Sequence, residues 1–125
     1  MDDDGKQLAL LVSSPGIIRE ATMILLASIP QMGRVELASG SLSAMEQLQN
    51  GHSYLLVIDA NLPVEEARSL VRWSKKHRPD IRCIAMVKNV VELEQLRSAG
   101  ADAVFLRSSS ARDLADALWS PDIER

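Results

Sequence analysis

One carboxylate, Asp59, directly follows the apolar run 54–58 in the segment SYLLVIDANLP (53–63). Its place predicts the carboxyl end of a strand, where a side chain can reach a ligand in the adjoining loop. A single carboxylate at such a position is more often a turn former or a helix cap. Chemistry at Asp59 therefore requires that other strand ends supply metal ligands, a hydroxyl or a base.

The elements that position Asp59 are short apolar runs that alternate with longer stretches of helical period. The expected strands lie in 8–12, 34–38, 54–58, 81–87 and 103–106. The helical stretches have apolar residues at three- and four-residue spacing; they are 15–29 (Ile17, Ile18, Ala21, Ile24, Leu25, Ile29), 42–48, 67–74, 90–99 and 114–118.

This alternation predicts an α/β fold of five strand–helix pairs, (βα)5, with a doubly wound, parallel five-stranded sheet. We expect the strand order 2-1-3-4-5, in which the winding direction reverses between the first and third strands. Sheets of this type bind ligands outside the carboxyl ends of their strands, at this point of reversal. The segment 13–16 (SSPG) should therefore face Asp59.

The length and composition of the chain fit one globular domain. Its 125 residues are 46% hydrophobic and 25% charged, which is ordinary for such a domain. We expect a single domain over 1–125 with flexible ends at 1–6 and 120–125, and an output domain of a longer protein after residue 125. The formal net charge of −3 indicates no basic surface, so we expect this segment not to bind nucleic acid.

Three further features indicate a cytoplasmic protein. Cys83 is the single cysteine, which excludes an internal disulfide and fits a reducing compartment. The chain begins Met-Asp-Asp-Asp, whereas a secretory signal peptide begins with basic residues. No apolar stretch approaches the roughly 20 residues that a membrane helix needs, so we expect no membrane contact.

Three segments carry a resemblance to a known family. They are LLVIDANLP (55–63), a strand followed by an aspartate and ending in a proline; AGADAVFLR (99–107); and PGIIRE (15–20). With these segments the chain resembles bacterial response-regulator receiver domains, which are CheY-like, along nearly its whole length. The segment 15–20 is similar to the first-helix start of receivers in LuxR/NarL-type transcriptional regulators. The resemblance implies a flavodoxin-like or receiver-like fold.

The resemblance also implies a role for Asp59 and exposes a change beside it. In the family a phosphoryl group moves onto the aspartate after the third strand, and two adjacent acids after the first strand hold a divalent metal. Those acids correspond here to Ser13 and Ser14, which are neutral. Because Mg²⁺ prefers several hard oxygen ligands and dehydrates reluctantly, we expect it to bind weakly, and we expect no required metal or cofactor.

Two other positions of the family's site are also changed. A hydroxyl after the fourth strand corresponds here to Val87 or Lys88, since the loop is about two residues short and the alignment is open. The lysine after the fifth strand corresponds to Arg107, which keeps the positive charge and changes its geometry. The phosphorylation site is therefore predicted to be degenerate.

Local alternatives remain open for these residues. Asp59 could cap the following loop, or form a permanent ion pair with Arg107 or Lys88. Ser14 precedes Pro15, and a serine N-cap followed by proline is a favoured helix start.

The expected function is that of an atypical receiver-like signalling module of a two-component-type, transcriptional regulator, without enzymatic activity. It would dimerise, or bind another signalling protein such as a sensor histidine kinase. The family's surface for this is made by the fourth helix, fifth strand and fifth helix. One alternative is a functional receiver phosphorylated on Asp59. A second is a flavodoxin-like module that binds a nucleotide, flavin or phosphate near 13–16.

Overall fold

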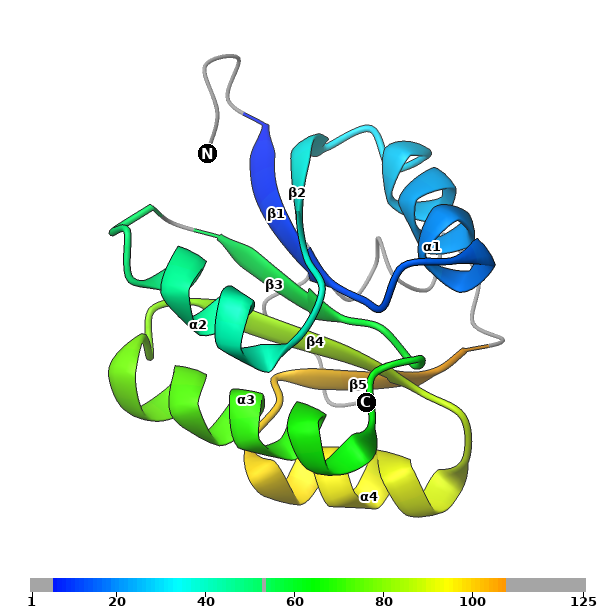
Figure 1. Cartoon of the computed structure of the whole chain (residues 1–125), viewed down its shortest axis with the longest axis vertical. Helices are drawn as coiled ribbons and strands as arrows, with labels where there is room; N and C mark the ends of the chain where they lie inside the picture. Colours follow the sequence, from blue (N-terminus) through cyan, green and yellow to red (C-terminus); the bar gives the residue numbers. More distant parts are fainter. Residues whose placement is uncertain (1–5, 53, 108–125) are drawn as a thin grey trace.

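The computed structural model describes residues 6–52 and 54–107. Its strands are β1 (Gln7–Val12), β2 (Met32–Ala38), β3 (Leu55–Ile58), β4 (Arg82–Val87) and β5 (Ala103–Leu106). Its helices are α1 (Ile17–Ala27), α2 (Ser41–Leu48), α3 (Val64–His77) and α4 (Val90–Ala99) (Figure 1). The strands form one parallel sheet in the order β2-β1-β3-β4-β5, which confirms the predicted order. The helix predicted over 114–118 and the predicted flexible ends, except Lys6, lie outside the described residues.

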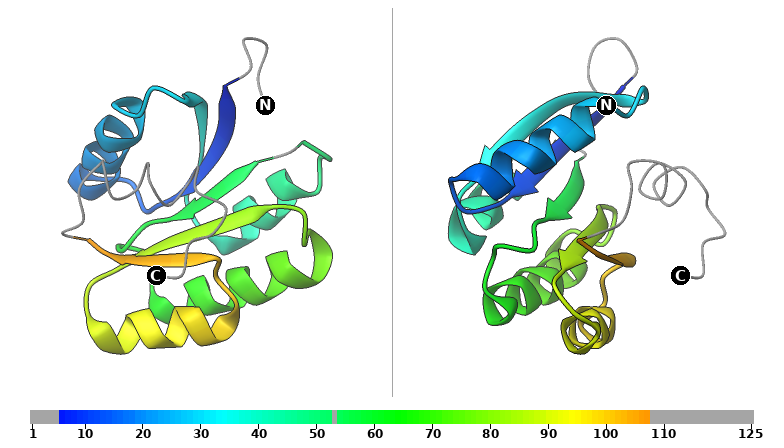
Figure 2. Two further views of the ribbon diagram at one scale, coloured as in Figure 1. Left: turned by 180° about the vertical axis from the view of Figure 1, so that it is seen from behind. Right: turned by 90° about the vertical axis from the view of Figure 1, so that its right-hand side faces the viewer.

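Strands β1, β3 and β4 are buried on both faces, as their nearly continuous apolar sequences require, whereas the edge strand β2 is partly exposed. In β3, Leu56 and Ile58 point into the core beneath α2, α3 and α4, whereas Leu55 and Val57 point into the core beneath α1. Figure 2 shows this sheet and its helices from two further directions. The two cores hold the central strands β1 and β3 rigidly, and these two strands carry the predicted site at their ends.

The start of α1 differs from the prediction that Ser14 caps it with Pro15 as the first helical residue. The helix begins at Ile17, and its N-cap is Gly16, which makes no side-chain cap. Gly16 has φ 144°, a left-handed value that glycine adopts more readily than any other residue. The turn into the helix therefore falls at Gly16, two residues later than expected.

The predicted apolar stripe of the first helical stretch is correct in part: Ile29 is buried, and Leu25 packs against the core beneath α1. Thr22 and Leu26 are buried against the sheet, whereas Ile17, Ala21 and Ile24 are exposed. The sequence of α1 is apolar almost all round, so periodicity favoured a stripe that overlaps only in part with the one that packs.

The N-terminus of α2 is capped from another helix. Its own N-cap, Gly40, offers no side chain, and Glu66 from the first turn of α3 fills the place. One carboxylate oxygen, Oε1, accepts the Ser41 N–H at 2.9 Å and the Ser41 hydroxyl at 3.1 Å. A carboxylate at this end also opposes the positive end of the helix dipole. Glu66 thus ties α2 to α3 at the carboxyl edge of the sheet.

The ends of α4 follow the sequence signals more directly. Asn89 is the N-cap, and its Oδ1 accepts the Glu92 N–H at 2.9 Å. Gly100 ends the helix in the left-handed conformation, with φ 113°. The turn at Gly100 leads into β5, which begins at Ala103.

Candidate functional site

The register of β1 and β3 brings Ser13 beside Asp59. Val12 and Ile58 are partners at the ends of the two strands, and the Asp59 N–H donates to the Val12 carbonyl at 3.0 Å. The Ser13 N–H donates to Ala38 on the other side, also at 3.0 Å. Both residues are thus held by the sheet itself, and the predicted closeness of 13–16 to Asp59 is correct for Ser13.

The Asp59 carboxylate is buried, and each of its oxygens accepts a hydrogen bond. The Ser13 hydroxyl donates to Asp59 Oδ2 at 2.8 Å, and the Ala60 N–H donates to Oδ1 at 2.8 Å. Only 1% of Asp59 is exposed. A buried carboxylate needs such donors, because an unsatisfied charge away from water is costly. Both oxygens that could reach a ligand therefore already have partners within the protein.

Asn61 belongs to the site, although the sequence reasoning did not single it out. Its Nδ2 donates to the Ser14 carbonyl at 3.0 Å, and its Oδ1 accepts the Ser14 N–H at 3.2 Å. We call these two bonds the Asn61–Ser14 amide pair. The available signal was an asparagine two residues beyond Asp59, in a loop, where this residue type commonly bonds backbone groups.

The Ser13 hydroxyl lies between two acceptors. It is 2.8 Å from Asp59 Oδ2 and 3.0 Å from Asn61 Oδ1. A hydroxyl has one proton to donate. Asn61 Oδ1 already accepts from Ser14, so the proton of Ser13 is needed at Asp59. Asp59, Ser13, Asn61 and Ser14 thus form one continuous network across the ends of β1 and β3.

The end of β4 contributes no hydroxyl to this network. Val87 is the last residue of β4, and its side chain is buried in the core beneath α2, α3 and α4. Lys88 is exposed, and its backbone N–H donates to Glu92 Oε1 at 3.3 Å. Neither of the two residues at the end of β4 carries a hydroxyl group.

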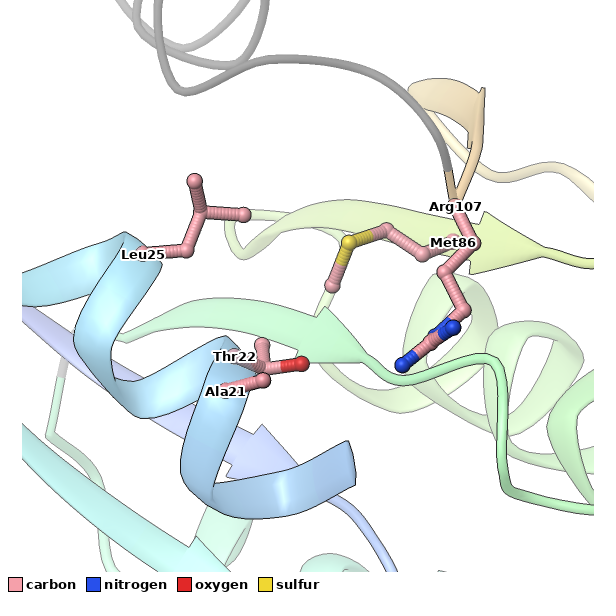
Figure 3. A pocket seen from close by; sticks show the side chains of 5 residues that line it. All are labelled: Ala21, Thr22, Leu25, Met86 and Arg107. Carbon is pink, nitrogen blue, oxygen red and sulfur yellow. The ribbon is translucent and has the colours of Figure 1, made fainter. Parts of the chain in front are cut away.

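Arg107 follows β5 directly and is exposed. With Met86 it lines a pocket of about 270 Å³, whose other lining residues, Ala21, Thr22 and Leu25, come from α1 (Figure 3). The pocket therefore combines the Arg107 guanidinium and the Thr22 side chain with three apolar side chains.

The expected permanent ion pair of Asp59 with Arg107 or Lys88 is wrong. Among residues 6–52 and 54–107, the ion pairs do not include Asp59. The physical reason is that Ser13 and Ala60 satisfy the buried carboxylate, while both bases remain at the surface. A loop-capping role for Asp59 is closer to what is found, because Asp59 Oδ1 accepts the next residue's N–H.

The donor set does not fit a Mg²⁺ site. Mg²⁺ demands near-octahedral coordination by hard oxygens, commonly from carboxylates. Within the part of the chain that the structure describes, no three His, Cys, Asp or Glu side chains come together. At the strand ends, Asp59 is one buried carboxylate whose neighbours Ser13 and Ser14 are neutral. The arrangement can hold two loops together, but it supplies few of the ligands that a metal ion requires.

Several solved structures have a similar fold. RcsB, a response regulator of Salmonella typhimurium, matches with a TM-score of 0.74 and 18% identity over 91% of this chain. A CheY-like receiver domain protein from Methanospirillum hungatei matches with a TM-score of 0.73 and 23% identity, covering 90% of each chain. A LuxR family DNA-binding response regulator from Silicibacter pomeroyi matches with a TM-score of 0.72 and 21% identity, over 90% of this chain and 88% of that one.

These likenesses confirm the receiver fold that the sequence motifs implied. The chain spans 58% of the RcsB chain. No family model and no curated protein matches the sequence. None of the helices described is both long and apolar enough to cross a membrane.

Proposed function

We propose that this domain is a receiver-like signalling module of the cytoplasm that acts by binding a protein and not by Mg²⁺-dependent phosphoryl transfer. The observation that carries the proposal is the engagement of Asp59. Phosphoryl transfer to a carboxylate depends on positioning the reactants and on stabilising the developing charge. Here Asp59 is 1% exposed, and both of its oxygens accept hydrogen bonds from within the protein.

Exposed apolar side chains support binding of a protein. Ile17, Leu42, Val90 and Val91, which we call the carboxyl-edge rim, are 82%, 77%, 64% and 68% exposed. They lie in the first turns of α1, α2 and α4, and each of these helices follows the carboxyl end of a strand. Exposed apolar residues that lie next to one another are typical of interaction sites, and Val90 and Val91 are neighbours in the first turn of α4. These two residues thus favour a partner that docks onto α4.

The partner is a second copy of the domain or another signalling protein, for which a sensor histidine kinase is one candidate. A small-ligand role near 13–16 has less support, because the Asn61–Ser14 amide pair already uses both backbone groups of Ser14. The module itself has no enzymatic activity in this proposal. It needs no cofactor, and any DNA binding belongs to another part of a longer protein.

The test is to incubate the purified domain with Mg²⁺ and acetyl phosphate and to measure intact masses. The matched variant is Asp59→Asn, and an ordinary receiver serves as the positive control. We expect no phosphate adduct under conditions that fully modify the control. An adduct on the wild type that is lost in Asp59→Asn would refute the proposal and identify a working phosphoacceptor. Sedimentation velocity on the same samples separates self-association from a different protein partner.

A further inference from the structure

We infer that Asn61 is the positioning residue that keeps the site closed: its amide pair with Ser14 latches the loop after β1 to the loop after β3. The inference rests on the proposed function, since a module without phosphoryl transfer can keep Asp59 covered. The latch joins the side-chain amide of Asn61 to the backbone N–H and carbonyl of Ser14.

The amide pair continues the hydrogen bonding between the two chain segments beyond the ends of β1 and β3. Backbone pairing between β1 and β3 ends at Val12 and Ile58. Beyond that point, Asn61 presents one donor and one acceptor to the two backbone groups of Ser14, at 3.0 and 3.2 Å. Because the side-chain amide matches the peptide group, both backbone groups of Ser14 are satisfied without another strand.

The pair is the last tie between the two loops before α1 starts. Pro15 has no N–H to donate, and Pro15 and Gly16 are both exposed. Gly16 has φ 144°, a conformation that glycine adopts more readily than other residues. Ser13, on the other side of Ser14, is fixed to β2 through Ala38 at 3.0 Å. Movement of the loop is therefore controlled at Ser14.

The latch is placed so that it can open without unfolding the sheet. Ser14 and Asn61 are both half-buried, so water can compete for their hydrogen bonds. By contrast, Ser13 and Asp59 are buried, and the Ser13 hydroxyl joins Asp59 Oδ2 to Asn61 Oδ1 of the latch. Opening the latch removes the Asn61 contact of the Ser13 hydroxyl and uncovers the Asp59 carboxylate. Asn61 thus acts on Asp59 through Ser13 and Ser14.

The experiment compares Asn61→Ala with the wild type in two measurements on the folded domain. Amide hydrogen exchange by NMR should rise about tenfold at Ser14, because its hydrogen-bond acceptor is gone. Carbodiimide-promoted coupling of a small amine to Asp59, followed by peptide mass spectrometry, should also rise about tenfold as the carboxylate becomes reachable. The matched control is Asn89→Ala, which removes a similar amide at α4 and should raise exchange at Glu92 and leave Asp59 covered.

The inference is overturned if Asn61→Ala leaves both exchange at Ser14 and coupling at Asp59 within about twofold of the wild type. If Asn61→Ala fails to fold, the wild type decides: a Ser14 amide that exchanges as fast as in an unstructured peptide refutes the latch, and a protected one supports it. Neither measurement uses Mg²⁺ or a phosphodonor. A phosphate adduct on wild-type Asp59 would therefore refute the proposed function separately from the latch.

Discussion

Replacing Glu66 by alanine should destabilise the domain through α2, a helix to which Glu66 does not belong. Glu66 Oε1 accepts both the N–H and the hydroxyl of Ser41 at the first residue of α2. Ser41 is buried, so its two donors would lose an acceptor that water replaces only in part. Gly40 cannot compensate, because it has no side chain to cap the helix.

The expected loss is about 2 kcal/mol of unfolding free energy. A hydrogen bond to a charged group contributes about 1.5–3 kcal/mol, and a carboxylate at a helix N-terminus adds about 0.3–1 kcal/mol. Because Glu66 is half-buried, water returns to the site in the variant and recovers part of this sum. Glu66→Gln keeps an acceptor oxygen and loses the charge, so its loss should be about 1 kcal/mol.

Urea denaturation followed by far-ultraviolet circular dichroism measures these differences. With a slope of about 2 kcal/mol per molar, Glu66→Ala should lower the midpoint by about 1 M. Glu65→Ala is the matched control in the same turn of α3. Glu65 is exposed and pairs with Arg68 at 3.3 Å, so this variant should lose less than about 0.5 kcal/mol of unfolding free energy. The reasoning fails if Glu66→Ala and Glu65→Ala unfold at the same urea concentration.

Two buried groups give further predictions. In the described part of the chain Ser74 Oγ is buried without a hydrogen-bond partner. Ser74→Ala should therefore leave the free energy of unfolding unchanged or raise it by about 1 kcal/mol. A decrease of more than about 1 kcal/mol, measured by urea denaturation, would contradict this. Burial raises the pKa of the Cys83 thiol from 9.0 to about 12, so at pH 8 the native thiol should resist a maleimide that labels the unfolded chain rapidly, and fast native labelling would contradict this. Since the unfolded thiol loses its proton at lower pH than the folded one, Cys83 should also lower stability as pH rises from about 9 towards 12.

The fold could be predicted because its signals are local and repeated. Four of the five strands are nearly continuous apolar runs, and such strands, buried on both faces of a parallel sheet, leave little choice of architecture. The orientation of α1 could not be predicted in the same way. Ile17 and Ile24 recur at helical spacing but are exposed, because a helix that is apolar almost all round offers more than one stripe to the sheet.

In the candidate site, too, the residues placed by the strands could be predicted and those placed by loops could not. Asp59 and Ser13 directly follow neighbouring strands, so the strand order was enough to place them together. Asn61 was missed because its role depends on the path of a loop that brings Ser14, 47 residues away in sequence, to its side-chain amide. Loop paths carry no periodic signal. The absence of an ion pair between Arg107 and Asp59 likewise depends on tertiary packing, which a sequence position does not reveal.

The network around Asp59 contains one carboxylate, two serines and an amide, and this balance affects how the domain responds to its medium. A cluster of carboxylates repels itself at close range and needs a bound cation to remain compact. With neutral groups beside Asp59, that repulsion is absent and the strand ends stay together without an ion. Changes in salt or in free divalent cations should therefore leave this edge as it is.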